Sequence, residues 1–271
     1  MSSSLARRFA HNFLAGLTGP FRLLSERRAL LIVLVRRDIA VRTSGTLLGG
    51  AWMLAQPGLQ VLAFWFLLDF VLKVRFPGQV PFISYFLLGM LPWLMMSEAI
   101  QRNLTVLSEF SNLYQRTVFP VAILPLLPVI VSGMFYTVIF TILAWASEGV
   151  IAALMTPVVS IALLIWIMPV CYLMAVLGLF IRDARQVVPF LLTLTMYLTP
   201  ILYLPEMLPP ALRDWVVLNP FADLMALIHG LLQGMPLTAG NFLRPLALWL
   251  LMLAPAWVLF RRTEPHMREE L

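Results

Sequence analysis

Few side chains in this 271-residue chain could catalyse a reaction or hold a metal ion. The three histidines, His11, His229 and His266, lie far apart in the sequence, and none belongs to an HExxH motif. No GxSxG motif supplies a hydrolase nucleophile. Cys171 lies in an apolar run. Because it is the single cysteine of the sequence, an intrachain disulfide and a thiolate metal site are excluded. We therefore expect no catalytic residue, metal site or cofactor in this chain, and we expect His229 to be a packed or hydrogen-bonded residue.

The sequence also lacks the residues that would bind ATP or couple transport to an ion gradient. Its single lysine, Lys73, is not preceded by glycine, so a phosphate-binding Gly-Lys-Ser/Thr loop is impossible. Asp69, Glu98 and Glu148 fall at the ends of apolar stretches, whereas ion-coupled carriers usually place acidic groups deep in the membrane. Glu98 and Arg102 are four residues apart and can pair on one helix. If the protein performs transport, ATP and Mg²⁺ are expected to bind to a separate subunit.

Aromatic and amide side chains are the main polar feature of the apolar stretches. Trp52, Gln56 and Gln60 recur every four residues and so share one helical face. Tyr197 and Tyr203 lie near the end of a later stretch. Aromatic faces stack on sugar rings and amides hydrogen-bond to sugar hydroxyls, so these five residues are candidates for lining a glycan conduit. The alternative is an aromatic belt at the membrane interface together with ordinary helix packing.

The composition identifies an integral membrane protein. Hydrophobic residues make up 61% of the chain, charged residues make up 12%, and the mean hydropathy is +0.90. Soluble domains contain about 45–50% apolar and about 25% charged residues, so neither a soluble fold nor a disordered chain fits. A net charge of +6 would suggest nucleic-acid binding in a soluble protein, but here the basic residues are expected at the membrane faces. Membrane lipids, and no nucleic acid, are therefore the expected partners.

Uncharged stretches predict an all-α polytopic protein with six transmembrane helices. Each stretch can supply the roughly 20 residues that a helix needs to cross about 30 Å of hydrocarbon. Residues 206–240 contain several glycines and prolines, so they are expected to form short re-entrant or interfacial helices on the outer side, with a seventh span as the alternative. The six stretches are residues 43–68, 76–97, 117–147, 149–181, 186–205 and 243–260, the last with Arg244 near its start, where this side chain can snorkel to the interface.

The N-terminal region is expected to lie along the cytoplasmic interface rather than to cross the membrane. Leu5, Phe9, Phe13 and Leu17 recur every four residues on one helical face, which is typical of an amphipathic interfacial helix. The apolar run at residues 29–35 extends only about 10 Å as a helix. Gly16, Gly19 and Pro20 interrupt the first 28 residues, which therefore lack the continuous apolar core of a secretory signal.

The basic residues orient the chain in the membrane. With six spans, all of the 19 lysines and arginines except Lys73, Arg75, Arg213 and Arg244 fall on the side of the two termini. The positive-inside rule identifies that side as the cytoplasm. The expected regions are a cytoplasmic N-terminal region (1–45), a six-span transmembrane domain (46–262) and a cytoplasmic tail (263–271).

Several short motifs occur together in a characteristic order. They are Arg36-Arg37-Asp38 with Arg42, Trp52 with Gln56-Pro57, Leu88-Gly89 with Pro92-Trp93, Phe119-Pro120, Leu124-Pro125, Phe180-Ile-Arg182-Asp183, Tyr197-Leu-Thr-Pro200-Ile-Leu-Tyr203, Leu208-Pro209 and Leu218-Asn219-Pro220. In order and spacing the set resembles the permease subunit of bacterial ABC exporters of lipid-linked polysaccharides, a family that includes O-antigen, teichoic-acid and capsule exporters. The resemblance covers about residues 30–262. Each motif alone is weak, whereas the ordered set is specific.

The resemblance implies a homodimeric permease that assembles with two ATP-binding-cassette subunits in the bacterial inner membrane. It implies ATP-driven export of a long glycan on a lipid carrier, with an outer gate formed by residues 206–240. The alternatives are an ABC permease for a drug or a lipid, an ion-coupled flippase and an intramembrane enzyme.

The resemblance also suggests which residues meet the ATPase and the lipid carrier. A coupling helix near Glu109–Val118 and a second cytoplasmic turn would contact the ATPase. Three arginines lie where a lipid diphosphate headgroup would approach, with membrane anchoring and topology alone as the alternative. The coupling residues are Glu109, Tyr114, Arg116, Arg182, Asp183 and Arg185, and the headgroup residues are Arg36, Arg37 and Arg42.

Overall fold

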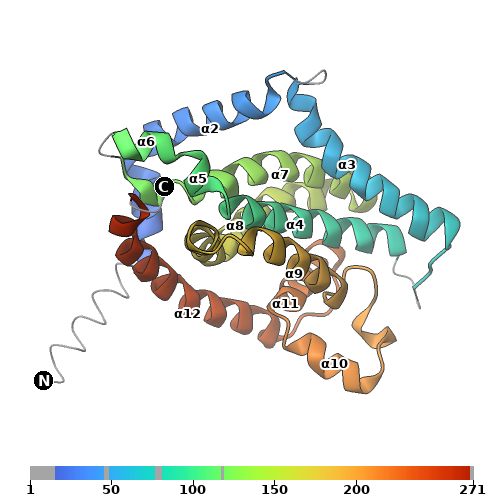
Figure 1. Ribbon diagram of the computed structural model, residues 1–271. Coiled ribbons are helices and arrows are strands. Elements are labelled where there is room, and N and C mark those ends of the chain that lie inside the picture. The colour runs from blue at the N-terminus through green and yellow to red at the C-terminus, as the bar shows by residue number, and fades with distance from the viewer. Residues whose placement is uncertain (1–15, 46–48, 77–80, 117–118, 269–271) are drawn as a thin grey trace, which may run out of the picture.

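The computed structural model is an all-α membrane protein, as the composition predicts (Figure 1). It describes residues 16–45, 49–76, 81–116 and 119–268, without the side chains of residues 114–116, 214 and 217. Within these described ranges there is no β-strand.

Among the described residues, five helical segments are long and apolar enough to cross a membrane. Each has at least 22 residues, which at 1.5 Å per residue exceeds the roughly 30 Å of the hydrocarbon core. In the first segment the turn η1 (Gly49–Ala51) and the helix α3 (Trp52–Trp65) continue into the π-helical turn η2 (Phe66–Val71). The other four are α4 (Phe82–Asn103), α7 (Leu126–Glu148) with the preceding turn η3 (Val121–Ile123), α8 (Val150–Phe180), and α12 (Ala239–Thr263) with the following turn η5 (Glu264–Arg268).

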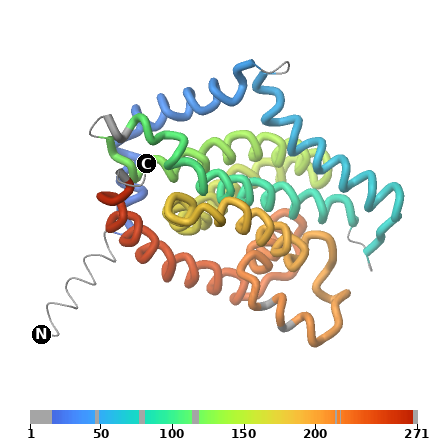
Figure 2. Tube along the Cα trace, viewed as in Figure 1, coloured from blue at the N-terminus to red at the C-terminus, as the bar shows by residue number. Residues whose placement is uncertain are grey.

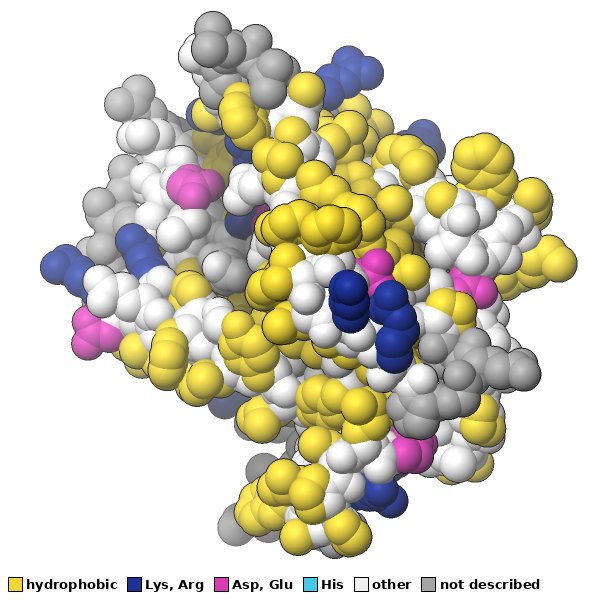
Figure 3. Space-filling model, turned by 90° about the vertical axis from the view of Figure 1, so that its right-hand side faces the viewer, with side chains coloured by type: hydrophobic (Ala, Val, Ile, Leu, Met, Phe, Trp, Pro, Cys, Tyr) yellow, Lys and Arg dark blue, Asp and Glu magenta, His cyan; other side chains and the backbone are white. Residues whose placement is uncertain are grey.

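The described start and end of the chain lie at one end of the molecule, which we call the terminal end (Figure 2). The short helices α5 (Val106–Glu109) and α6 (Ser111–Arg116) lie there too, and α6 contacts η5. The opposite end, which we call the loop end, carries the turn after η2 and the segment between α9 and α12 (Figure 1). Figure 3 views this loop end, where hydrophobic side chains surround scattered charged ones.

The predicted fifth span corresponds to α9 (Ala184–Leu198), which has only 15 residues. Two hydrogen bonds show how this segment runs through the bundle, one near each end of α4. Arg185 donates from Nη2 to Ser108 Oγ (2.7 Å) beyond the last residue of α4, and the Tyr85 hydroxyl, in the first turn of α4, donates to the Pro200 carbonyl (2.9 Å). The segment from Arg185 to Pro200 therefore runs from one end of α4 to the other. The count of six spans stays a prediction, because α9 is shorter than the five long segments.

The segment between α9 and α12 forms short helices, as its glycines and prolines predict. The turn η4 (Pro205–Met207) and the exposed helix α10 (Pro210–Val217) precede α11 (Pro220–Gln233). The Asn219 side chain accepts a hydrogen bond from the Phe221 amide (3.0 Å), and Pro220 occupies the first helical position, so the sequence starts α11 at this point. Since α11 packs against α4, α8 and α12, it is part of the bundle, and its re-entrant position in the membrane stays a prediction.

The N-terminal residues of the described structure pack closely against α12. Residues 16–26 form a helix that contains Gly16 and Gly19. A Cβ atom at Gly16 would collide with Ala254, and one at Gly19 would collide with the indole of Trp257, so both glycines permit close packing against α12. Leu17 lies in this helix, while the other three members of the predicted apolar face are outside the described residues.

The helix α2 (Arg28–Thr43) follows and positions the first polar residues of the site. Its apolar side chains Leu31, Leu34 and Val35 are buried, whereas Ile32 and Val33 are exposed. The helix therefore buries one face against the bundle and leaves the other open, which fits an interfacial helix.

The helix α4 forms the centre of the bundle. Most of its side chains are buried, and it packs against α3, α7, α8, α9 and α11. By contrast, only 11% of the most apolar part of the first span is buried. This difference means that α3 presents a face that another molecule or lipid must cover.

Candidate functional site

A small polar pocket lies where α2, α3, α4 and α7 meet. Its volume is about 170 Å³. Arg42 comes from the last turn of α2, while Trp52 and Gln56 come from the first turns of α3, where their four-residue spacing places them on one face. The full lining is Arg42, Trp52, Met53, Gln56, Pro57, Glu98, Val131, Ser132, Phe135 and Tyr136. The structure thus brings together three predicted site residues, whereas Gln60 does not line this pocket.

Four charged side chains join α2 to α4 beside this pocket. Arg102 Nη2 contacts Asp38 Oδ1 at 2.8 Å and Oδ2 at 2.9 Å. Arg42 contacts Asp38 Oδ2 at 3.2 Å through Nε and Glu98 Oε1 at 3.3 Å through Nη1. Glu98 and Arg102 can pair along α4 by their spacing, but in the structure each is instead paired with an opposite charge from α2.

Asp38 is the most buried member of this network. Its residue is only 6% exposed, so its carboxylate depends on the two arginines for stabilisation. Burial raises the pKa of the Asp38 carboxyl, and the nearby Arg42 charge acts in the opposite direction. The network therefore fixes α2 to α4 at the point where the chain enters its first span.

The three arginines predicted to meet a lipid headgroup have different surroundings. Arg42 is engaged by two carboxylates, as described above. Arg36 and Arg37 are exposed on α2, and the Arg37 guanidinium lies 5.4 Å from the centroid of the Phe110 ring. A headgroup role thus stays a prediction, and the geometry favours the two exposed arginines for it.

The two segments predicted to contact an ATPase lie side by side at the terminal end. Arg185 at the start of α9 donates to Ser108 Oγ of α5 (2.7 Å) and to the Gly178 carbonyl (3.2 Å). Glu109, which accepts a hydrogen bond from Thr105, is exposed, as are Arg182 and Asp183. Tyr114 and Arg116 belong to α6, but their side chains lie outside the described residues.

Tyr197 and Tyr203 line a different cavity, of about 450 Å³, between α9 and α10. Asn219 also lines this cavity and donates to Thr199 Oγ1 (2.8 Å), which ties the end of α9 to the start of α11. Within the described part of one chain, four of the five predicted conduit residues therefore form two separate groups, Trp52 with Gln56 and Tyr197 with Tyr203, and Gln60 lines neither cavity.

Nearby, His229 is a packed polar residue, as predicted. It is buried on α11, its ring stacks on Tyr85 with centroids 3.7 Å apart, and its Nδ1 lies 2.9 Å from Gln233 Oε1. Gln233 Nε2 in turn donates to Ser84 and Glu148. These contacts connect α11 to α4 and α7 and describe a structural network.

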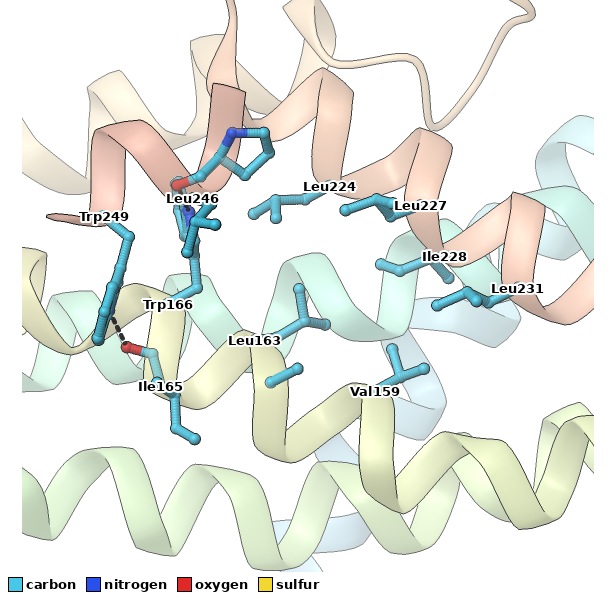
Figure 4. A pocket seen from close by; sticks show the side chains of 12 residues that line it. Val159, Leu163, Ile165, Trp166, Leu224, Leu227, Ile228, Leu231, Leu246 and Trp249 are labelled. Atoms are coloured by element: carbon cyan, nitrogen blue, oxygen red, sulfur yellow. Dashed lines mark hydrogen bonds between the residues drawn. The ribbon is translucent and has the colours of Figure 1, made fainter. Parts of the chain in front are cut away.

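A wholly apolar groove lies between α8, α11 and α12 (Figure 4). Its volume is about 370 Å³. Trp166 Nε1 donates to the Pro245 carbonyl (2.9 Å) and Trp249 Nε1 donates to the Ile165 carbonyl (2.8 Å), so both indole N–H groups are satisfied within the protein. This groove can accept a hydrocarbon chain, but it offers a sugar no hydrogen-bonding group.

Comparison with known proteins reveals related permeases. Two O-antigen export system permease proteins RfbA of Klebsiella pneumoniae are 26% and 25% identical over 202 residues, or 72% of this chain and 77% of each relative. The RfbA permease of Myxococcus xanthus is 28% identical over 211 residues, or 75% of this chain and 80% of that protein. This chain is similar to O-antigen export permeases. The resemblance predicted from the ordered motifs is confirmed, although no family model matches the chain.

Several polar residues that lie together in the structure could not be found from the sequence. Ser132 and Tyr136 of α7 line the polar pocket with Glu98. Asp223 of α11 is bound by Arg244 (2.9 Å) and by Asn241 (2.9 Å). The partners come from different helices far apart in the sequence, so no local spacing could indicate them.

Proposed function

We propose that this chain is the membrane-spanning permease subunit of an ABC exporter for a lipid-linked polysaccharide. The observation that carries the proposal is the similarity to O-antigen export permeases over about three quarters of the chain. The all-α fold with long apolar helices supports it. The permease forms the path across the bacterial inner membrane with both termini in the cytoplasm, and it breaks no covalent bond.

The energy for export comes from two ATP-binding-cassette subunits, which bind ATP and Mg²⁺. The terminal end supports this part of the proposal because α5, α6 and the turn before α9 adjoin there. Exposed charges at Glu109, Arg182 and Asp183 provide polar contacts for an ATPase. The bond from Arg185 to Ser108 joins the two segments, so a movement of the ATPase acts on both together.

Two copies of the permease form the glycan path. The largely exposed α3 supports this arrangement, because its polar residues Gln56 and Gln60 are unfavourable against lipid. A second copy would cover this face and would leave an aqueous path lined by amide and aromatic groups. Arg36 and Arg37 receive the anionic headgroup of the lipid carrier at the cytoplasmic interface.

Deletion of the gene in its own host tests the proposal. The deletion strain is expected to lose the surface polysaccharide and to accumulate lipid-linked glycan in the cytoplasmic leaflet. Plasmid-borne wild type restores export only when the ATPase subunit is present. Unchanged surface polysaccharide, or export that continues without the ATPase and stops with an ionophore, would contradict the proposal. Loss of resistance to a drug, with normal polysaccharide, would indicate a drug permease instead.

A further inference from the structure

The polar pocket between α2, α3, α4 and α7 contains a buried hydroxyl group with no partner. Ser132 is only 2% exposed, and its Oγ makes no hydrogen bond within the described structure. The same residue lines the pocket together with Tyr136 and Glu98. A buried hydroxyl without a partner is energetically costly, so its position beside a cavity points to a ligand that completes its hydrogen bonding.

The charges beside the pocket indicate what kind of ligand fits. Arg42 and Arg102 carry two positive charges, and Asp38 and Glu98 carry two negative charges, all four linked by the ion pairs described above. The set is therefore neutral overall. An anion such as a phosphate would have to compete with both carboxylates for Arg42, whereas a neutral ligand can bind without separating the ion pairs.

The size of the pocket and the residues that line it further limit which ligands can bind. Its volume of about 170 Å³ is below the about 300–1,000 Å³ typical of sites for drug-sized ligands. Trp52 supplies an aromatic face, while Gln56, Ser132 and Tyr136 supply hydrogen-bonding groups that can donate and accept. A single ring with one apolar face and several hydroxyls matches this arrangement.

We propose that this pocket binds one neutral sugar ring of the exported glycan, and this inference rests on the proposed function. Trp52 stacks on the ring, Ser132 and Tyr136 bond to its hydroxyls, and Glu98 accepts from a further hydroxyl while it remains paired with Arg42. Trp52 and Gln56 stand in the first turns of the first span, so the sugar binds where the glycan enters the membrane. The pocket thus selects the glycan by its sugar and leaves the headgroup to other residues.

The test measures binding of three probes to the permease purified in nanodiscs with its ATPase subunits. The probes are the host's own lipid-linked glycan, extracted from cells that lack the permease, the free glycan released from it by mild acid, and the carrier lipid phosphate. Ser132→Ala and Tyr136→Phe are expected to weaken binding of the free glycan about three- to tenfold, the usual effect of one lost hydrogen bond. Binding of the lipid phosphate is expected to stay unchanged.

Ser160→Ala is the matched control. Ser160 is also buried (1% exposed) and its Oγ also lacks a partner within the described structure, but it does not line the pocket. Its substitution is expected to leave all three dissociation constants unchanged. An equal effect of Ser132→Ala and Ser160→Ala, or no effect of Ser132→Ala and Tyr136→Phe on the free glycan, would overturn the inference.

Glu98→Gln tests the charge argument separately. It leaves an excess positive charge beside Arg42, so the lipid phosphate is expected to bind more tightly to this variant than to wild type. If the phosphate already binds in the wild-type pocket and is weakened by Ser132→Ala, the pocket recognises phosphate and the sugar inference is wrong. If wild type neither binds nor exports the lipid-linked glycan, the proposed function itself is wrong. If wild type exports normally and the pocket variants bind the glycan as tightly as wild type, only the sugar site in the pocket is wrong.

Discussion

Asp38 and Arg102 form the closest link between the interfacial helix α2 and the central helix α4. Their side chains are 7% and 12% exposed and approach to 2.8 Å. Removing one member of such a buried pair usually costs more than removing both, because the remaining charge loses its partner.

Arg102→Met is therefore expected to destabilise the protein by about 2 kcal/mol, less than the about 3–5 kcal/mol for a fully unpaired buried charge, because Arg42 still contacts Asp38. Thermal unfolding of the detergent-solubilised protein measures the change. Adding Asp38→Asn is expected to recover most of the loss, and Arg262→Met, at an exposed position in the last turn of α12, serves as the control. A double variant less stable than Arg102→Met would contradict this explanation.

For individual residues, the sequence indicated contacts within one helix and missed contacts between helices. The four-residue spacing of Trp52 and Gln56 predicts their shared face, and the pocket confirms it. Spacing also allowed the pair Glu98 and Arg102, but their ion-pair partners in the structure lie 56 and 64 residues away in the chain. Ser132 gives no signal in the sequence, since only packing shows that its hydroxyl is buried.

Among the elements, the N-terminal helix shows how packing overrides local propensity. Glycine and proline at positions 16, 19 and 20 have low helix propensity, yet residues 16–26 form a helix, which close contact with α12 stabilises. The five long spans, by contrast, could be located from the apolar runs, since the cost of placing charges in the hydrocarbon limits each run, whereas α9 is shorter than its run.

Gly19→Leu tests the contact between the N-terminal helix and α12. The larger side chain would collide with Trp257, so the variant is expected to lose about 1–3 kcal/mol of stability. Trypsin is expected to cut faster after the arginines of residues 16–28. In the control variant, Gly58→Ala, the new Cβ meets no atom within 4 Å. Equal proteolysis of both variants would show that the N-terminal helix does not depend on this close packing.

Arg182→Glu tests the turn before α9 as part of the ATPase contact. The exposed charge reversal is expected to lower glycan-stimulated ATP hydrolysis of the complex several-fold and to leave membrane insertion and thermal stability unchanged. Lys73→Glu reverses another exposed charge at the loop end and serves as the control. Glycan-stimulated ATP hydrolysis at the wild-type rate in the Arg182→Glu complex would show that this turn is not part of the ATPase contact.

For the whole molecule, the distribution of burial indicates which face meets a second copy. The helix α3 is little buried and carries Gln56 and Gln60, whereas α8 is exposed mainly through aliphatic side chains that lipid can cover. An exposed amide within a span is better placed against protein or water than against hydrocarbon. The face of α3 that contains Gln60 is therefore the expected contact between the two permease copies.

A cysteine on this face gives a direct measurement of the contact. The natural chain has a single cysteine, Cys171, which is fully buried, so an added cysteine reports only on its own position. Ala63→Cys lies one turn after Gln60 and is exposed, and it is expected to form a disulfide-linked dimer when membranes are treated with a mild oxidant. Ala162→Cys, also at an exposed position but on α8, is expected to stay monomeric. Cross-linking at residue 162 without cross-linking at residue 63 would place the dimer contact on α8 and leave α3 facing lipid.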